Sequence, residues 1–154
     1  MRALPEPVAE FLAGRRIMVA GVSRNPQHFA NAIFRKLHGA GYEVVALNPN
    51  AEEIDGFTCY HDLAAVPGRI DGIVAAMHPR YGRKLVEDAA ERGVGRIWFH
   101  RLLGGGSVSP EAVGECRARG IRCIVGGCPL MYVPPVDPFH RLFCWLQRRP
   151  GRPG

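Results

Sequence analysis

A short polar loop near the amino terminus carries the residues best suited to bind an anion. Gly21 ends an apolar run, and the residues that follow it precede a helical pattern that starts near Phe29. Ser23 and Asn25 offer hydrogen-bonding groups, and Arg24 offers a positive charge. Backbone N–H groups at the start of a helix also favour a phosphate. The spacing therefore predicts a phosphate-binding loop, with an ordinary polar turn as the alternative.

The histidines and cysteines form no recognisable catalytic or metal-binding pattern. His78 and His100 are expected at strand ends near the loop, but neither has an identifiable carboxylate partner. The five cysteines are an odd number without a short paired spacing, which disfavours a disulfide framework or a zinc ribbon. We therefore expect reduced thiols, no metal site and no catalytic residue.

Cys128 is the one thiol whose position suggests chemistry. It follows Gly126 and Gly127 at the end of an apolar run, so we expect it to be accessible near the edge where a ligand would bind. A reactive thiol would need a lowered pKa, from a helix dipole or a nearby arginine. Two alternatives stay open, a thiol with a redox or exchange role and a small residue that only fills space.

The segments that must position these groups alternate between strand and helix patterns. Helices are predicted from near Phe29, from Tyr81 and from Ser109, which is a suitable N-cap with a proline after it. The segment 51–67 is predicted to be a loop-rich crossover with a short helix at 62–65. The predicted strands are 17–21, 43–47, 71–77, 96–100 and 121–125. This alternation predicts an α/β fold, a doubly wound Rossmann-like domain with a five-stranded parallel sheet.

In such a fold the carboxyl ends of the strands meet at one edge, where ligands bind. Asn48 and Pro49 follow the second strand, and His78 and Pro79 follow the third. A dinucleotide site would show G-x-G-x-x-G after the first strand and an acid after the second. Only Gly21 of that glycine pattern is present, and Asn48 takes the place of the acid. NAD(P) is therefore kept as an alternative ligand and is not the first choice.

The carboxyl-terminal residues differ in character from the rest of the chain. Three prolines in the run 133–138 predict a stiff connector, so we divide the chain into a domain at 1–132 and a connector, helix and basic tail at 133–154. Asp137 can cap a terminal helix. Its apolar stripe would consist of Phe139, Leu142, Phe143 and Leu146. Such a stripe must be buried, either against its own domain or against a second subunit, and both alternatives stay open.

The composition narrows the class of protein. With 154 residues, 47% of them hydrophobic and 22% charged, the chain has the balance of a soluble globular protein. The net charge is +6, but the tail after His140 holds four arginines and no acid, so most of this charge belongs to the tail. The rest of the chain does not show the clustered basic and aromatic residues of a nucleic-acid surface. The apolar runs are shorter than the roughly 20 residues that span a membrane, and no apolar signal core is present. We expect a cytoplasmic protein that binds neither nucleic acid nor membranes.

Several of these segments together resemble the CoA-binding domain family in order and spacing. The resemblance covers roughly residues 15–129, and its most specific parts are the G-x-S-x-x-P loop and the Asn-Pro strand end. It is carried by GVSRNP at 21–26, EVVALNPN at 43–50, DGIVAAM at 71–77 with Pro79 after it, RIWF at 96–99, and the final strand leading to Cys128. The family includes small stand-alone proteins and the amino-terminal domain of the succinyl-CoA synthetase α subunit.

The resemblance implies roles for the loops at the strand ends. It implies that the first loop cradles the CoA phosphates, that the end of the second strand contacts the nucleotide, and that the loop after the third strand borders the ligand. The implied binding residues are Gly21, Val22, Ser23, Arg24, Asn25, Pro26, His28, Asn48, Pro49, His78 and Pro79. A basic residue, often lysine, is common in the family two positions after the loop proline, and this chain has His28 there.

We therefore expect a non-catalytic protein that recognises the adenosine phosphate part of CoA or of an acyl-CoA. The synthetase resemblance ends before the second domain that carries the phosphohistidine, so ligase activity is not expected of this chain alone. One alternative is an NAD(P)-binding oxidoreductase or redox sensor. Another is an interaction subunit of a CoA-dependent synthetase or transferase, which would dock its partner through the terminal helix. A homodimer through the same helix is a further expectation.

Overall fold

A seven-stranded sheet forms the centre of the protein, and the computed structural model describes residues 4–101 and 106–133. The strand order is β3-β4-β2-β1-β5-β6-β7, and neighbours are parallel except for β3 and β4. The strands are β1 (Arg16–Ala20), β2 (Glu43–Leu47), β3 (Glu53–Ile54), β4 (Phe57–Tyr60), β5 (Gly72–Ala75), β6 (Arg96–Phe99) and β7 (Arg122–Val125). The five strands predicted from the sequence are all present, as β1, β2, β5, β6 and β7.

The predicted number of five strands is nevertheless wrong, because the segment 51–67 contains two more. Ile54 pairs with Phe57 across a two-residue turn made by Asp55 and Gly56, whose φ angles are 49° and 82°. Positive φ at both turn positions fits a type I′ hairpin, for which Asp-Gly is a typical sequence. β4 then pairs in parallel with β2. The segment therefore extends the sheet as well as crossing to β5.

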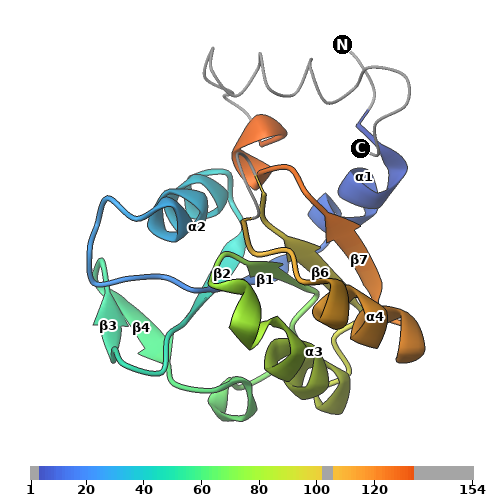
Figure 1. Cartoon of the computed structure of the whole chain (residues 1–154). Coiled ribbons are helices and arrows are strands. Elements are labelled where there is room, and N and C mark those ends of the chain that lie inside the picture. Colours follow the sequence, from blue (N-terminus) through green and yellow to red (C-terminus); the bar gives the residue numbers. More distant parts are fainter. Residues whose placement is uncertain (1–3, 102–105, 134–154) are drawn as a thin grey trace.

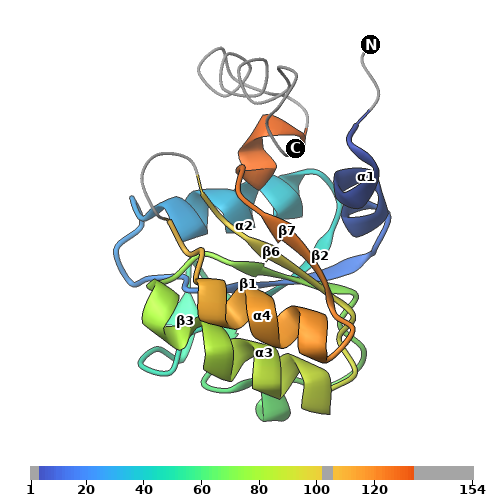
Figure 2. The same cartoon turned by 45° about the vertical axis from the view of Figure 1, so that its right-hand side comes forward.

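Helices cover both faces of the sheet, as in a doubly wound fold (Figure 1). Figure 2 shows α1 and α2 on one face and α3 and α4 on the other. The helices are α1 (Glu6–Leu12), α2 (Phe29–Gly39), α3 (Gly82–Glu91) and α4 (Pro110–Ala118), and the short 3-10 turns are η1 (Leu63–Ala65), η2 (Pro79–Tyr81) and η3 (Pro129–Met131). The predicted N-cap of the last helix is confirmed, since Ser109 Oγ accepts a hydrogen bond from the Ala112 N–H at 3.3 Å.

Two apolar clusters, one on each face, hold the helices in place. Trp98 of β6 is fully buried, and its ring meets Phe11 of α1 edge-on with 5.4 Å between the ring centroids. The Trp98 indole N–H donates to the Gly126 carbonyl at 3.0 Å, so its polar group is satisfied. On the opposite face, Leu85 and Val86 of α3 pack in the other cluster. Burial on both faces explains why the central strands read as continuous apolar runs.

The predicted connector and terminal helix, from residue 134 onward, lie outside the described residues. The division of the chain after residue 132 therefore stays a prediction. Of the helices in the described ranges, none is both long enough and apolar enough to cross a membrane.

Candidate functional site

The carboxyl ends of β1, β2 and β5 surround a cavity of about 550 Å³, which we call the strand-end cavity. Its walls come from the loop after β1, the residues after β2, the segment around η1, the end of β5 and the first turns of α3. The sequence-predicted residues that line it are Gly21, Val22, Ser23, His28, Asn48, Pro49 and His78. The fold thus brings most of the residues singled out in the sequence to one cavity.

The remaining predicted residues lie beside this cavity. Arg24, Asn25 and Pro26 are exposed on the outer part of the loop after β1. Pro79 lines a neighbouring cavity that is described below. Contact of these residues with a ligand stays a prediction.

Gly21 fixes where the loop leaves the sheet. Its φ is +108°, and its N–H donates to the Leu47 carbonyl of β2 at 3.2 Å. A Cβ atom at this position would lie 2.2 Å from the carbonyl oxygen of Ala76, just beyond β5. Only glycine has both the conformation and the space that this close approach requires. The loop therefore starts from a fixed point between two neighbouring strands.

Asn31, which is not among the residues predicted from the sequence, holds the first half of the loop. It is 1% exposed on α2, and its Oδ1 accepts from the Ser23 N–H at 2.7 Å. Its Nδ2 donates to the Ser23 carbonyl at 2.6 Å and, more weakly, to the Asn25 carbonyl at 3.4 Å. The signal for this role was an asparagine within the apolar stripe of a helix, where a buried amide needs partners.

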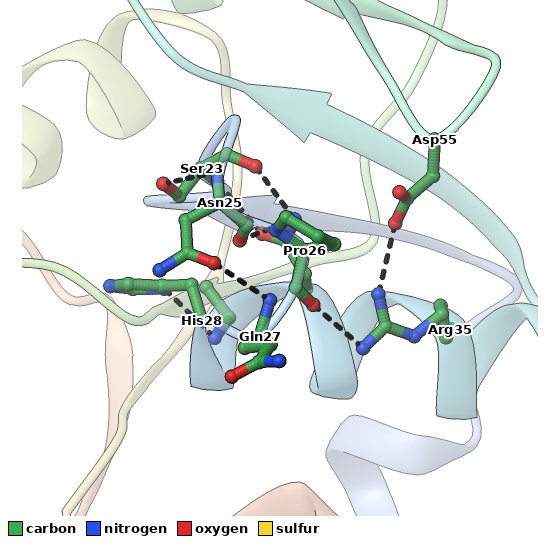
Figure 3. A network of polar contacts seen from close by, with 9 residues as sticks. Ser23, Asn25, Pro26, Gln27, His28, Arg35 and Asp55 are labelled. Carbon is green, nitrogen blue, oxygen red and sulfur yellow. Dashed lines mark hydrogen bonds and ion pairs between the residues drawn. The ribbon is translucent and has the colours of Figure 1, made fainter.

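A second set of hydrogen bonds shapes the outer half of the loop (Figure 3). Ser23 Oγ accepts from the Asn25 N–H, and Asn25 Oδ1 accepts from the Gln27 N–H, each at 3.1 Å. Arg35 donates to the Pro26 carbonyl at 3.0 Å and forms an ion pair with Asp55 of the β3–β4 turn at 3.0 Å. The loop is therefore held from α2 and from the hairpin before any ligand binds.

His28 is the N-cap of α2. Its Nδ1 accepts from the Ala30 N–H at 3.2 Å, which places the proton of the neutral ring on Nε2. Burial lowers the pKa of His28 below its ordinary value of 6.5, so the ring is neutral at pH 7. The ring also stacks on Phe29, with centroids 4.4 Å apart, and Phe29 stacks on His100 at 4.7 Å. Position 28 thus supplies a hydrogen-bond donor and no permanent positive charge.

Lys84 supplies a positive charge from the opposite wall of the strand-end cavity. It lies on α3, and its Nζ contacts Asp88 Oδ1 at 2.6 Å. This hydrogen bond raises the pKa of Lys84, which keeps the ammonium group protonated. Lys84 is not among the residues predicted from the sequence. The available signal was its place in the first turn of the helix after the third predicted strand, which starts at the same edge of the sheet.

Asn48 connects the end of β2 to the loop after β1. Its Nδ2 donates to the Val22 carbonyl at 2.6 Å, and its Oδ1 accepts from the Asn50 N–H at 2.7 Å. The side-chain amide is therefore engaged within the protein, where an acidic residue would bind a ribose in a dinucleotide site. Asn48 helps to shape the cavity wall that Pro49 and Asn50 continue.

A second cavity of about 580 Å³ adjoins the first, and we call it the Phe29 cavity. The two share His28, Met77 and His78. The other lining residues are Phe29, Pro79, His100, Gly106, Ser107, Cys128 and Leu130. Cys128 is only 2% exposed, so the expectation of an accessible thiol is wrong: the following turn η3 and the apolar cluster around it cover the side chain. Its reactivity stays a prediction.

The part of the chain that the structure describes contains no candidate metal-binding site. There, the His, Cys, Asp and Glu side chains form no group of three or more that could hold a metal ion.

Comparisons with known proteins identify the family and support the fold. The family model described as CoA binding domain matches residues 15–134. The solved structure of a conserved hypothetical protein from Pyrococcus furiosus is 32% identical with a TM-score of 0.67, and the match covers 75% of this chain and 96% of that one.

Two curated proteins are also similar in sequence. The uncharacterized protein YneT of Bacillus subtilis (strain 168) is 25% identical over 114 residues, which are 74% of this chain and 82% of that protein. The acetate–CoA ligase [ADP-forming] II subunit alpha of Pyrococcus furiosus is 26% identical over 85 residues, 54% of this chain. That match spans only 19% of the ligase subunit.

Proposed function

Because the chain belongs to the CoA-binding domain family, we propose that it binds the adenosine phosphate part of coenzyme A in the strand-end cavity. The observation that carries this proposal is the loop after β1, which is held in place by Asn31 and opens on a cavity of about 550 Å³. A loop that is already ordered loses little conformational entropy on binding. The match to the family supports CoA as the ligand.

Three groups of different chemistry would meet the phosphates. The Ser23 hydroxyl accepts from a backbone N–H, so its own proton is available to an anion. His28 offers its Nε2–H at the start of α2, where the helix dipole favours negative charge. Lys84 adds the positive charge that the family usually has at the position of His28. Pro49, Leu63 and Leu85 give the same cavity an apolar surface for a planar base.

We propose a binding role without catalysis by this chain alone. His28 and His78, which line both cavities, each cap a helical turn. His28 Nδ1 accepts from the Ala30 N–H, and His78 Nδ1 accepts from the Arg80 N–H at 3.1 Å. A histidine whose Nδ1 accepts a backbone N–H cannot donate from that nitrogen to an orienting carboxylate. These hydrogen bonds favour a structural and binding role for both rings.

CoA is preferred to NAD(P) on two grounds. The family model that matches the chain is that of a CoA-binding domain. The amide of Asn48 is engaged with Val22 and Asn50 and is not an acid poised for a ribose. Thermal unfolding with CoA, acetyl-CoA, NAD and NADP tests the choice, because a ligand that binds only the native state raises the melting temperature. A shift with NADP and none with either CoA species would refute the proposal.

A second candidate role is that of a partner for a CoA-dependent synthetase or transferase. It is favoured by the similarity to the acetate–CoA ligase subunit, of which this chain matches about a fifth. The docking surface would be the predicted terminal helix, which could equally join two copies of this chain. Light scattering of the full chain and of a chain truncated before Asp137 tests the dimer. A dimer through this helix predicts a dimeric full chain and a monomeric truncated chain. The same oligomeric state in both chains argues against it.

A further inference from the structure

The two cavities lie side by side above the carboxyl ends of the strands. The strand-end cavity extends toward α3, and the Phe29 cavity extends toward α2 and η3. His28, Met77 and His78 contribute to both. The two cavities therefore adjoin at these three residues, and a ligand longer than a nucleotide would have to pass them to reach the second.

The walls of the Phe29 cavity suit an apolar group. Phe29, Met77, Pro79 and Leu130 supply apolar surface. Among the polar lining groups, Ser107 is 2% exposed and its Oγ accepts the Met77 N–H at 2.8 Å. A hydrocarbon chain has no hydrogen bonds to water to lose on entering such a cavity.

Phe29 itself is an apolar ring held in contact with solvent. It is 43% exposed, although it stands between His28 and His100 in a fixed stack. Tyr81, which is 49% exposed, lines only the strand-end cavity. Covering the exposed part of Phe29 with an apolar ligand would remove apolar area from water and so favour binding.

We propose that the Phe29 cavity receives the acyl group of a CoA thioester, so that the protein binds acyl-CoA in preference to free CoA. This rests on the proposed function, because it requires the nucleotide in the strand-end cavity. The acyl group is short and apolar, as the cavity of about 580 Å³ must also admit the end of the pantetheine arm.

Calorimetric titration of the full chain with CoA, acetyl-CoA, butyryl-CoA and hexanoyl-CoA tests the proposal. Each fully buried methylene is expected to tighten binding by roughly fourfold. With partial burial, butyryl-CoA should bind about tenfold more tightly than acetyl-CoA. Equal dissociation constants for free CoA and all three thioesters would overturn the proposal, as would tighter binding of free CoA.

Phe29→Ala and Tyr81→Ala form a matched pair of variants. Phe29→Ala should weaken free CoA less than hexanoyl-CoA and lose most of the dependence on acyl chain length. Tyr81→Ala should weaken all four ligands by a similar factor and retain that dependence. If Phe29→Ala weakens free CoA and hexanoyl-CoA equally, the Phe29 cavity does not hold the acyl group. Circular dichroism establishes that each variant is folded.

The titrations distinguish the absence of an acyl site from the absence of CoA binding. If free CoA binds to the wild-type chain and the thioesters bind no better, only the acyl site is refuted. If none of the four ligands binds, the proposed function is refuted and the acyl site with it.

Discussion

The side-chain amide of Asn31 closes a pair of hydrogen bonds with the backbone of Ser23. Oδ1 accepts from the Ser23 N–H at 2.7 Å, and Nδ2 donates to the Ser23 carbonyl at 2.6 Å. Asn31 belongs to the first turn of α2, whereas Ser23 belongs to the loop that leaves β1. One buried side chain thus sets the position of the residue that we propose to contact a phosphate.

Replacing Asn31 should destabilise the protein and weaken CoA binding together. Asn31→Ala leaves the N–H and the carbonyl of Ser23 without these partners, at an expected cost of about 2 to 3 kcal/mol in the free energy of unfolding. Asn31→Asp has the same shape but sets an oxygen against the Ser23 carbonyl, so it should cost more. Urea denaturation and calorimetric titration with CoA measure both effects.

The control for Asn31 is Asn25→Ala, which removes a hydrogen bond from an exposed turn. It should cost less than 1 kcal/mol, or roughly the net value of one exposed hydrogen bond. If Asn31→Ala is no more destabilising than Asn25→Ala, the loop is not held as we describe.

Gly21→Ala should be among the most damaging single substitutions in the loop. The new Cβ would meet the Ala76 carbonyl, and alanine would have to adopt a φ near +108°. Such strain costs about 1 to 3 kcal/mol before the steric contact is counted. Gly114→Ala is the control, because α4 leaves open space there, and alanine in a helix should stabilise by about 0.5 to 1 kcal/mol. Thermal and urea unfolding compare the two, and equal effects would contradict the close packing at Gly21.

His28 should make stability fall as the pH drops. Because burial lowers the pKa of the folded-state ring below 6.5, the unfolded chain binds more protons than the folded chain in that range. The contribution is therefore complete above about pH 6.5 and is lost as the pH falls through the folded-state pKa.

His28→Asn isolates this effect, since asparagine is a good N-cap and does not titrate. Between about pH 7.5 and pH 5.5, the wild-type free energy of unfolding should decrease more than that of the variant. Urea denaturation at the two pH values gives the comparison. Parallel changes in both proteins would mean that His28 does not titrate as its burial requires.

Lys84→Gln should weaken CoA binding several-fold at low ionic strength and less at high salt, because an exposed positive charge is screened by salt. The chain has two lysines, and the other one, Lys36, is near the far end of α2 and does not line the cavity. Lys36→Gln is therefore the matched control and should leave the affinity unchanged. Equal losses in both variants would show a general effect of net charge.

The positions of the central strands could be predicted from local sequence patterns, whereas the β3–β4 hairpin was not predicted. EVVAL and RIWF are apolar runs with turn residues at their ends, and they form β2 and β6. β3 and β4 are short and only partly apolar, so no run marks them. The Asp55-Gly56 pair between Ile54 and Phe57 was the available signal.

The candidate site could be predicted only for residues in the loops that follow strand ends. Ser23, Asn48 and His78 are such residues, and all three line the strand-end cavity. Lys84 and Asn31 lie on helices, and which face of a helix meets the cavity depends on how it packs against the sheet. That packing involves residues distant in the sequence, so a linear pattern does not specify it.

CoA binding at the loop after β1 is tested by calorimetric titration of CoA into the wild-type chain and into Ser23→Asp. Ser23→Asp places a carboxylate against the proposed phosphate position and should abolish or strongly weaken binding by like-charge repulsion. We predict saturable binding of CoA at one site in the wild type, little or none in Ser23→Asp, and no comparable binding of NAD or NADP. Unchanged CoA affinity in Ser23→Asp, or binding of NADP in place of CoA, would contradict CoA binding at this loop.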